Sequence, residues 1–394
     1  MDIGVLRERK QDENRVALQP VQAGQLVARG HRVWVEEGCG QSSGFRDEEY
    51  AEAGARVCDK AEALKRCELV LKVKAPLESE YGDYQARHTL FTFLHFDENF
   101  PAERIARLIR PGLLGIAYEW VEREGDHPLL TPMSRLTGYL FAQRAVELCT
   151  RHKGIVCGQY EPGLSGARVL VIGLGRIGLS AAAFCLHNRA RLSLLDKHPQ
   201  SVNDRLNAKL GTRGVDHVVR HGIEVLGFDR AEPRRSVQAL VGILPRTDIV
   251  LGCAVRRPDL PRSQLEYLID DGMVRSMQPG SVLCDATACD RDLYETVVSK
   301  ESLTEFDVIH GVVHYSPDHI PSYVGRTATE LLTAATFPYV LAMAERGVLR
   351  ALREMPDLRR GVSCYQGHLT LERAAQKKSM PFRPIEELLA GERR

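Results

Sequence analysis

The chain has 394 residues, more than one hydrophobic core usually supports, so two domains are expected. Lysine plus arginine (53) nearly balances aspartate plus glutamate (52), which predicts neither a nucleic acid nor a membrane surface as partner. The first residues are charged and no apolar run is long enough to cross a bilayer, so a cytoplasmic protein is expected. The ten cysteines form no CxxC pair, which is typical of reduced, structural thiols.

Strand-like apolar runs alternate with helical patterns along the whole chain. The first series of runs covers residues 3–6, 31–37, 68–74, 88–96 and 113–120. A second series covers residues 167–173, 191–196, 247–255, 281–288 and 307–315. This βα alternation predicts an α/β fold made of two Rossmann-like, doubly wound domains with a cleft between them.

Two segments are expected to connect the domains. Pro132 and Ser134 are suited to open a long helix, and "SPDHIPSYVGRTATELL" predicts a loop that runs into a second helix. The predicted domains are a substrate domain of residues 1–131 plus 326–394 and an NAD-binding domain of residues 132–325. The tail, residues 347–394, shows only weak helical patterns and is expected to pack on the first domain.

Gly173, Gly175 and Gly178 have the GxGxxG spacing, directly after an apolar strand and at the start of a helix rich in small residues. In that context the first glycine permits a tight turn, and the second lets backbone amides approach a pyrophosphate. The third lets the helix pack closely on the strand. The helix N-terminus adds partial positive charge, so a dinucleotide site is predicted.

Asp196 ends the next strand, where a carboxylate accepts hydrogen bonds from the ribose hydroxyls and repels a 2′-phosphate. NAD is therefore favoured over NADP, although Lys197 and His198 would offset part of this negative charge. The predicted cofactor site also includes Arg176, Ile177, Cys253 and Ala254.

Three basic residues in the first series are candidates for the reacting centre. Lys74 closes the run "LVLKVK", and His95 lies near the end of "LFTFLHF", interpreted as one buried strand. Because ligands gather at the carboxyl ends of parallel strands, both should face one crevice. Arg15, in "DENRVALQP", would add a bidentate grip on a carboxylate. Each alone is more commonly structural, but together with a dinucleotide fold they favour a substrate site.

Asp290 follows the strand whose end should border a nicotinamide, whereas Asp285, inside that strand, is interpreted as structural. His310, His314 and His319 are closely spaced, but they lack a set of carboxylates or thiols. No metal site is predicted there.

These segments resemble the alanine dehydrogenase family, which shares its fold with the transhydrogenase nucleotide domain and saccharopine dehydrogenase. "GVLRERKQDENRVALQP", "LVLKVKAPL", "FTFLHF" and "PLLTPMSRLTG" have the order and spacing of that family. The resemblance implies that Arg15 and Lys74 hold the substrate's carboxylate and carbonyl. It also implies that His95 is the acid/base, that Asp290 works beside it on water or ammonia, and that Ser134 contacts the cofactor. A homo-oligomer is implied as well.

Two departures leave a second hypothesis open. "RDL" follows Asp290 where the family has Q-G-G, and "DHIPSYVGRTAT" stands where it has D-N-M-P. His319 in D-H-x-P-S resembles saccharopine dehydrogenase and N5-(carboxyethyl)ornithine synthase, and it is assigned to substrate binding.

The leading hypothesis is an NAD-dependent dehydrogenase that interconverts an L-amino acid with its 2-oxo acid and ammonia. The first alternative is an opine-type reductase that condenses a 2-oxo acid with an amino acid's amine. The second is a non-catalytic NAD-binding protein.

Overall fold

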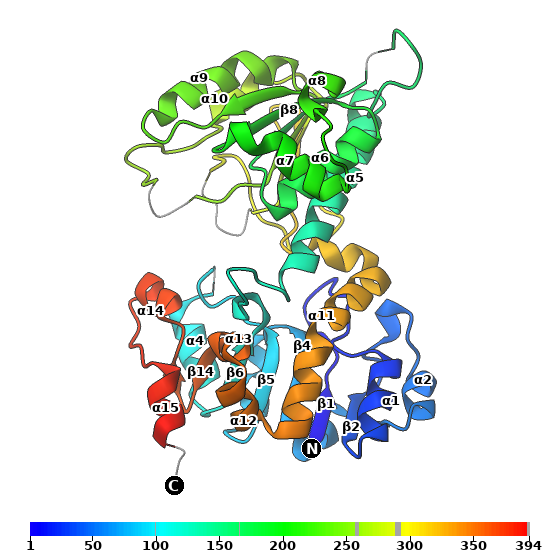
Figure 1. Ribbon diagram of the computed structural model, residues 1–394, viewed down its shortest axis with the longest axis vertical. Helices are drawn as coiled ribbons and strands as arrows, with labels where there is room; N and C mark the ends of the chain where they lie inside the picture. The colour runs from blue at the N-terminus through cyan, green and yellow to red at the C-terminus, as the bar shows by residue number, and fades with distance from the viewer. Residues whose placement is uncertain (99, 165, 257–259, 288–292, 392–394) are drawn as a thin grey trace. The chain divides into compact units, whose positions relative to one another are not determined.

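The computed structural model describes residues 1–394 except 99, 165, 257–259, 288–292 and 392–394. The chain divides into two compact units, each built on one sheet (Figure 1). Unit 1 comprises Met1–Met133 and Ser322–Arg394, and unit 2 comprises Ser134–Pro321. No helix in the described part of the chain has the length and apolar character needed to cross a membrane. The α/β fold with two largely parallel sheets was predicted and is confirmed.

Unit 1 contains an eight-stranded sheet in the order β15-β14-β6-β5-β4-β1-β2-β3. Its strands are β1 (Asp2–Val5), β2 (Arg32–Glu36), β3 (Arg56–Cys58), β4 (Leu69–Lys74), β5 (Thr89–Phe93), β6 (Leu114–Ala117), β14 (Val362–Tyr365) and β15 (His368–Leu369). Its helices are α1 (Pro20–Ala28), α2 (Asp47–Glu52), α3 (Lys60–Arg66), α4 (Ala102–Ile109), α11 (Gly325–Arg346), α12 (Val348–Glu354), α13 (Pro356–Arg360), α14 (Glu372–Lys378) and α15 (Ile385–Gly391).

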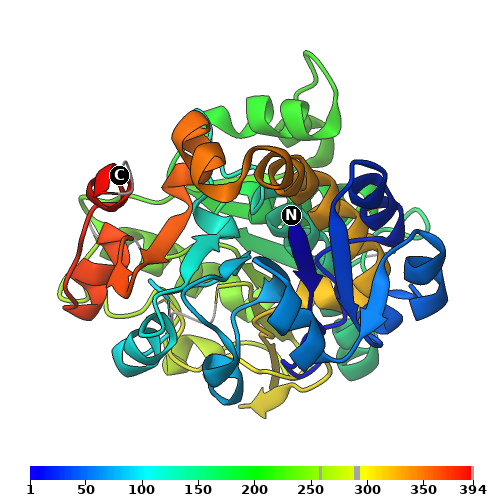
Figure 2. The ribbon, with the colours of Figure 1, turned by 90° about the horizontal axis from the view of Figure 1, so that it is seen from below.

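The six N-terminal strands of unit 1 run parallel in the order 3-2-1-4-5-6, so the winding reverses beside β1. Strands β4 and β5 are buried on both faces, which is why their sequences are nearly continuous apolar runs. Figure 2 shows β14 and β15 (orange and red) at the opposite end of this sheet from β2 and β3 (blue). The crevice between the carboxyl ends of β1 and β4 is the expected ligand position in such a sheet.

Unit 2 contains a seven-stranded sheet in the order β12-β13-β11-β10-β7-β8-β9. Its strands are β7 (Arg168–Ile172), β8 (Arg191–Asp196), β9 (Glu224–Gly227), β10 (Ile249–Gly252), β11 (Val282–Asp285), β12 (Asp307–Ile309) and β13 (Val312–Tyr315). Its helices are α5 (Thr131–Lys153, which begins in unit 1), α6 (Arg176–His187), α7 (Val202–Leu210), α8 (His217–His221), α9 (Pro233–Ile243) and α10 (Asp271–Arg275). The parallel strands again follow the order 3-2-1-4-5-6, with the reversal beside β7.

Two hairpins differ from the sequence prediction. Residues 307–315 form not one strand but the antiparallel pair β12–β13, because His310 and Gly311 have φ values of +52° and +78°. The tail likewise contains β14 and β15 rather than helices alone, and Gln366 and Gly367 turn with φ of +50° and +79°. Two successive positive φ values are the geometry of a two-residue hairpin turn. Each turn therefore adds an antiparallel strand at a sheet edge.

Candidate active site

The glycine-rich turn of unit 2 joins β7 to α6. Gly173 has a φ of +86°, and a Cβ there would lie 2.7 Å from the Cβ of Ala254. A Cβ on Gly178 would lie 1.8 Å from the carbonyl oxygen of Gly173, so only glycine lets helix and strand approach this closely. At Gly175, the N-cap of α6, an added Cβ would meet nothing within 4 Å. Open space therefore lies in front of the backbone at the middle glycine.

Asp196, the last residue of β8, is buried beside this turn with 6% of its surface exposed. Its carboxylate accepts hydrogen bonds from the backbone N–H of Leu174 (2.7 Å) and of His198 (2.8 Å). Arg205 Nη2 donates to the same group at 2.8 Å. Burial raises the pKa of Asp196, but these donors outweigh burial and hold the pKa below its usual value. A fixed negative charge therefore stands at the end of β8.

A pocket of about 370 Å³ opens at the carboxyl ends of β7, β8 and β10. Eight of the predicted cofactor residues line it: Ser134, Gly173, Gly175, Arg176, Ile177, Asp196, Cys253 and Ala254. Gly178 packs beneath the turn instead of lining the pocket. Ser134 lies in the first turn of α5, so it does not cap that helix. Lys197, Arg205 and Arg230 also line the pocket, which places positive charge near Asp196.

These residues fit a dinucleotide. The N-terminus of α6 and the open backbone at Gly175 suit a pyrophosphate, because the N–H groups and the dipole of a helix N-terminus attract anions. Asp196 suits a ribose diol, and the apolar lining provided by Leu195, Val255 and Leu268 suits aromatic ring systems.

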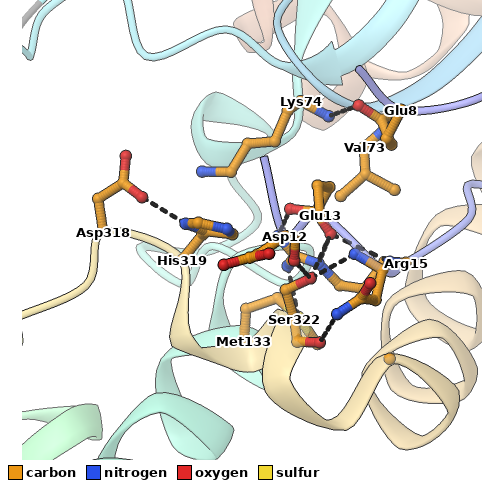
Figure 3. A network of polar contacts seen from close by, with 12 residues as sticks. Glu8, Asp12, Glu13, Arg15, Val73, Lys74, Met133, Asp318, His319 and Ser322 are labelled. Carbon is orange, nitrogen blue, oxygen red and sulfur yellow. Dashed lines mark hydrogen bonds and ion pairs between the residues drawn. The ribbon is translucent and has the colours of Figure 1, made fainter. Parts of the chain in front are cut away.

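In unit 1, the end of β4 is held by the carboxylate of Glu8. This carboxylate accepts hydrogen bonds from the backbone N–H of Val73 (2.6 Å) and of Lys74 (3.3 Å). The ammonium of Lys74 points away from Glu8 (Figure 3). The fixed backbone therefore sets the direction in which the Lys74 side chain leaves the strand.

Glu8 also belongs to a buried cluster of charges with Lys72, which is 0% exposed. The Lys72 ammonium lies 3.4 Å from Glu8 and 3.8 Å from Glu80. Burial raises the pKa of Glu8, and Lys72 opposes that shift. An ammonium in a buried strand requires such partners, so Lys72 is interpreted as structural.

Arg15 lies on the loop between β1 and α1 and is 3% exposed. Its Nε and Nη2 donate to the two carboxylate oxygens of Glu13, at 2.7 and 2.6 Å, and Nη1 lies 3.3 Å from the sulfur of Met133 (Figure 3). One edge of the guanidinium is therefore already engaged in a two-bond fork with protein. A bidentate grip on a substrate through that edge would require Glu13 to be displaced.

Hydroxyl groups fix the loop that carries Arg15. Ser322 Oγ donates to the Asp12 carbonyl (2.7 Å), lies 3.1 Å from Glu13 Oε1, and accepts from the N–H of Asn14 at 2.5 Å (Figure 3). Thr329, on α11, accepts from the N–H of Val16 at 3.1 Å. The Glu13–Arg15 pair is thus held against residues more than 300 positions away in sequence.

His95 lies two residues beyond the end of β5, not inside the strand as predicted. The Glu119 carboxylate accepts the N–H groups of Leu94 and His95, so these groups cannot continue the strand ladder. His95 then turns at a φ of +52°, and its ring stacks on Phe93 at 5.4 Å between centroids. Since non-glycine residues rarely adopt positive φ, the buried carboxylate maintains a strained backbone at this position.

The His95 side chain is 25% exposed, and its Nδ1 lies 3.2 Å from the Glu98 carboxylate. Burial lowers the pKa of His95, but the negative charges of Glu98 and Glu119 raise it more, and the result lies above the usual value. The same ion pair, against the effect of burial, lowers the pKa of Glu98 to about 2. The imidazole is thus oriented and partly accessible, as a proton-transfer group requires.

The other predicted residues have mixed outcomes. Asp290 lies outside the described residues. Asp285 accepts hydrogen bonds from the N–H and the hydroxyl of Thr287, which agrees with the structural interpretation. His314 is buried and contacts Thr296 and a carbonyl. His319 is 2% exposed, and its Nδ1 lies 2.5 Å from the carboxylate of Asp318 (Figure 3).

Lys74 ends β4 and His95 follows β5, which places both at the carboxyl ends of adjacent strands of unit 1, and Arg15 lies on the long loop that follows the neighbouring strand β1. Sequence reasoning missed the carboxylates that hold them: Glu8, Glu13, Glu98 and Glu119. The spacing of Glu13 and Arg15 in "DENR" was an available signal, since an arginine that becomes buried needs a near counter-charge.

The chain is similar to known proteins over its whole length. Residues 4–137 match the family model "Alanine dehydrogenase/PNT, N-terminal domain", and residues 140–372 match "Alanine dehydrogenase/PNT, C-terminal domain". It is 35% identical to alanine dehydrogenase of Bacillus subtilis, over 100% of this chain and 98% of that protein. It is 33% identical to alanine dehydrogenase of Methanococcus maripaludis, over 99% of this chain and 100% of that protein.

Solved structures are similar to this chain as well. An L-alanine dehydrogenase superposes with a TM-score of 0.81 at 32% identity, covering 96% of this chain and 99% of the other. A transhydrogenase from Sinorhizobium meliloti, at 20% identity, shares the fold with a TM-score of 0.72, over 93% of this chain and 98% of the other. With two family models spanning most of the sequence and relatives above 30% identity across it, the chain belongs to the alanine dehydrogenase/PNT family.

Proposed function

We propose that this protein is an NAD-dependent amino-acid dehydrogenase that interconverts an L-amino acid with its 2-oxo acid and ammonia. The observation that carries the proposal is that Lys74 and His95 lie at the carboxyl ends of the adjacent strands β4 and β5, with Arg15 on the loop after the neighbouring strand β1. Unit 1 then serves as the substrate domain, and unit 2 as the dinucleotide domain. The full-length similarity to alanine dehydrogenases supports the same reaction class.

When bound, the nicotinamide dinucleotide supplies the hydride acceptor for the amino acid's α-carbon. The chain's own residues bind the substrate and manage protons. Lys74 donates to the carbonyl or imine position, and Arg15 holds the carboxylate through donors other than the edge used by Glu13. His95 accepts a proton from the attacking water and later returns it to the departing ammonia. Asp290, from the sequence resemblance, assists His95.

The proposed cofactor is NAD rather than NADP. Asp196 carries a fixed negative charge at the end of β8, and that charge would repel a 2′-phosphate. Arg205 and Lys197 lie at the same pocket and oppose this effect. We expect a higher kcat/KM with NADH than with NADPH, and Asp196→Ser should narrow the ratio. Equal use of both cofactors by the unaltered protein would contradict the assignment.

One observation favours a second candidate function, an opine-type reductase. The Asp318–His319 pair of unit 2 holds an imidazole beside a carboxylate, and the D-H-x-P-S segment that contains it resembles the opine-type enzymes. Oxidation of NADH by pyruvate should be measured with ammonia, ornithine and lysine, with products identified by mass. Consumption with ammonia alone supports the dehydrogenase. Consumption only with a diamino acid supports the reductase, and no turnover with any amine contradicts both.

We further propose a homo-oligomer located in the cytoplasm. Val156 and Tyr160 are 50% and 78% exposed on the segment between α5 and β7, an apolar pair that suits contact with a second copy. Every cysteine in the described ranges is a free thiol, which suits a reducing compartment. The mass in solution should be measured by sedimentation for the unaltered protein and for Tyr160→Ser. The variant should have the smaller mass, and a monomer in both cases would contradict the oligomer.

A further inference from the structure

A second cavity of unit 2, of about 720 Å³, lies at the amino ends of strands β7, β8 and β9, whereas the dinucleotide pocket lies at carboxyl ends. Arg168 and Arg191, which line it, are the first residues of β7 and β8. Gly173 and Asp196, by contrast, lie at the carboxyl ends of the same two strands. The cavity is therefore separate from the site already described.

Arginine dominates the charge of this cavity. Five exposed arginines from four segments line it: Arg168, Arg189, Arg191, Arg220 and Arg246. Among the described residues of the lining, Glu224 is the only acid, and it lies 3.5 Å from Arg246 and accepts from Ser193. The near-neutral net charge of the chain conceals this local excess. We call it the arginine cavity.

The arginine cavity has the chemistry of an anion site. Guanidinium groups gathered around one space repel each other, and a bound anion removes that repulsion. Their planar forks match phosphate oxygens with two hydrogen bonds each. The floor is formed by buried apolar residues, among them Ala190, Leu192 and Ile243, and the volume lies in the range of small-molecule sites.

Arg189 lines the arginine cavity from the end of helix α6. It follows the C-cap of α6 with a φ of +56°, a conformation that glycine adopts freely and arginine adopts at a cost. This left-handed residue ends the helix, since its N–H donates to the Leu186 carbonyl and the N–H of Ala190 donates to the Cys185 carbonyl.

We propose that the arginine cavity binds a small polyphosphate anion, either a nucleoside polyphosphate or an inorganic phosphate chain. This site is additional to the proposed dehydrogenase and does not depend on it. Several arginines around one space suit a ligand with several phosphoryl groups better than a single carboxylate.

The test is calorimetric titration of the full chain with ATP and with tripolyphosphate at low salt, with NADH present to saturate the dinucleotide pocket. We expect one site per chain, an affinity that falls steeply with added salt, and at least about tenfold weaker binding to Arg189→Gly/Arg191→Ser. Glycine at 189 relieves the backbone strain, so this variant should fold. Tighter binding of ATP identifies a nucleotide site, and equal binding identifies a phosphate-chain site.

The matched control is Arg346→Ser/Arg350→Ser, which removes two exposed arginines paired with Glu354 in unit 1. It should bind both probes as the unaltered chain does. Equal weakening in both double variants, or no binding of either probe to the unaltered chain, would overturn the proposal. A smaller mass in sedimentation for Arg189→Gly/Arg191→Ser than for the unaltered chain would also overturn the proposal. It would show that these arginines lie in a contact between copies of the chain.

Discussion

The two sheets share one strand order, but different kinds of residue lie at the point where the order reverses in each. In unit 2, the turn from β7 into α6 contains three glycines, and open space lies in front of the backbone at Gly175. In unit 1, the loop after β1 carries Arg15 and the end of β4 carries Lys74, and each residue is held by a buried carboxylate. The same scaffold therefore supports a backbone site for a common cofactor and a side-chain site for a particular substrate.

The sharpest test of the side-chain site is His95→Asn. Asparagine tolerates positive φ, so the backbone at this position should survive. We expect kcat to fall by roughly 10²–10⁴-fold, the usual contribution of a general acid or base, while the affinity for NADH changes little. Steady-state kinetics and fluorescence titration measure the two quantities.

The matched control is His310→Asn, which changes another histidine with a φ of +52° at the β12–β13 turn. It should leave kcat near its original value. Equal loss of turnover and NADH binding in His95→Asn would show that His95 serves packing.

The backbone site is tested by comparing two glycines. Gly178→Ala places a Cβ 1.8 Å from a carbonyl oxygen, so the turn must shift, and both stability and NADH affinity should fall, stability by about 1–3 kcal/mol. Gly175→Ala meets no protein atom within 4 Å, so the melting temperature should hold while NADH affinity drops severalfold. Unchanged affinity in Gly175→Ala would separate this turn from the pyrophosphate.

A smaller effect is expected from Glu13→Gln, which keeps the shape of the partner of Arg15 and removes its charge. The orientation of the guanidinium should loosen, and KM for the 2-oxo acid should rise about tenfold, with a lesser change in kcat. Glu52→Gln, on exposed α2, is the control. If KM stayed constant, the role of Arg15 in carboxylate binding would be refuted.

The smallest effect is a shift in pH dependence. The Glu98 carboxylate raises the pKa of His95, so Glu98→Gln should lower it. For amino-acid oxidation His95 acts as a neutral base, and the rising limb of kcat/KM should therefore move to lower pH. A profile that did not move, or moved to higher pH, would show that His95 is not the titrating group.

Sequence patterns predicted well the parts of the molecule that local chemistry determines. The apolar runs of β4 and β7 and the GxGxxG spacing report burial and backbone geometry directly. The sequence did not predict the hairpin turns at His310 and Gln366, because neither residue is a typical first residue of such a turn.

Residues that act over long sequence distances were beyond the reach of pattern reasoning. His95 leaves its strand because Glu119, 24 positions away, captures two N–H groups. Ser322 meets the loop of Arg15 from 308 positions away. No periodicity encodes such pairings, since they follow from the assembled sheet.

The strand β6 pairs with β14, and Ser322 accepts from the N–H of Asn14, so unit 1 joins two segments of the chain that flank unit 2. Unit 2 is continuous, from Ser134 to Pro321. During synthesis the ribosome therefore releases all of unit 2 before the segment that completes unit 1 exists. Because domains fold as units once their residues are available, unit 2 should fold before unit 1, since residues 1–133 must await the translation of residues 322–394.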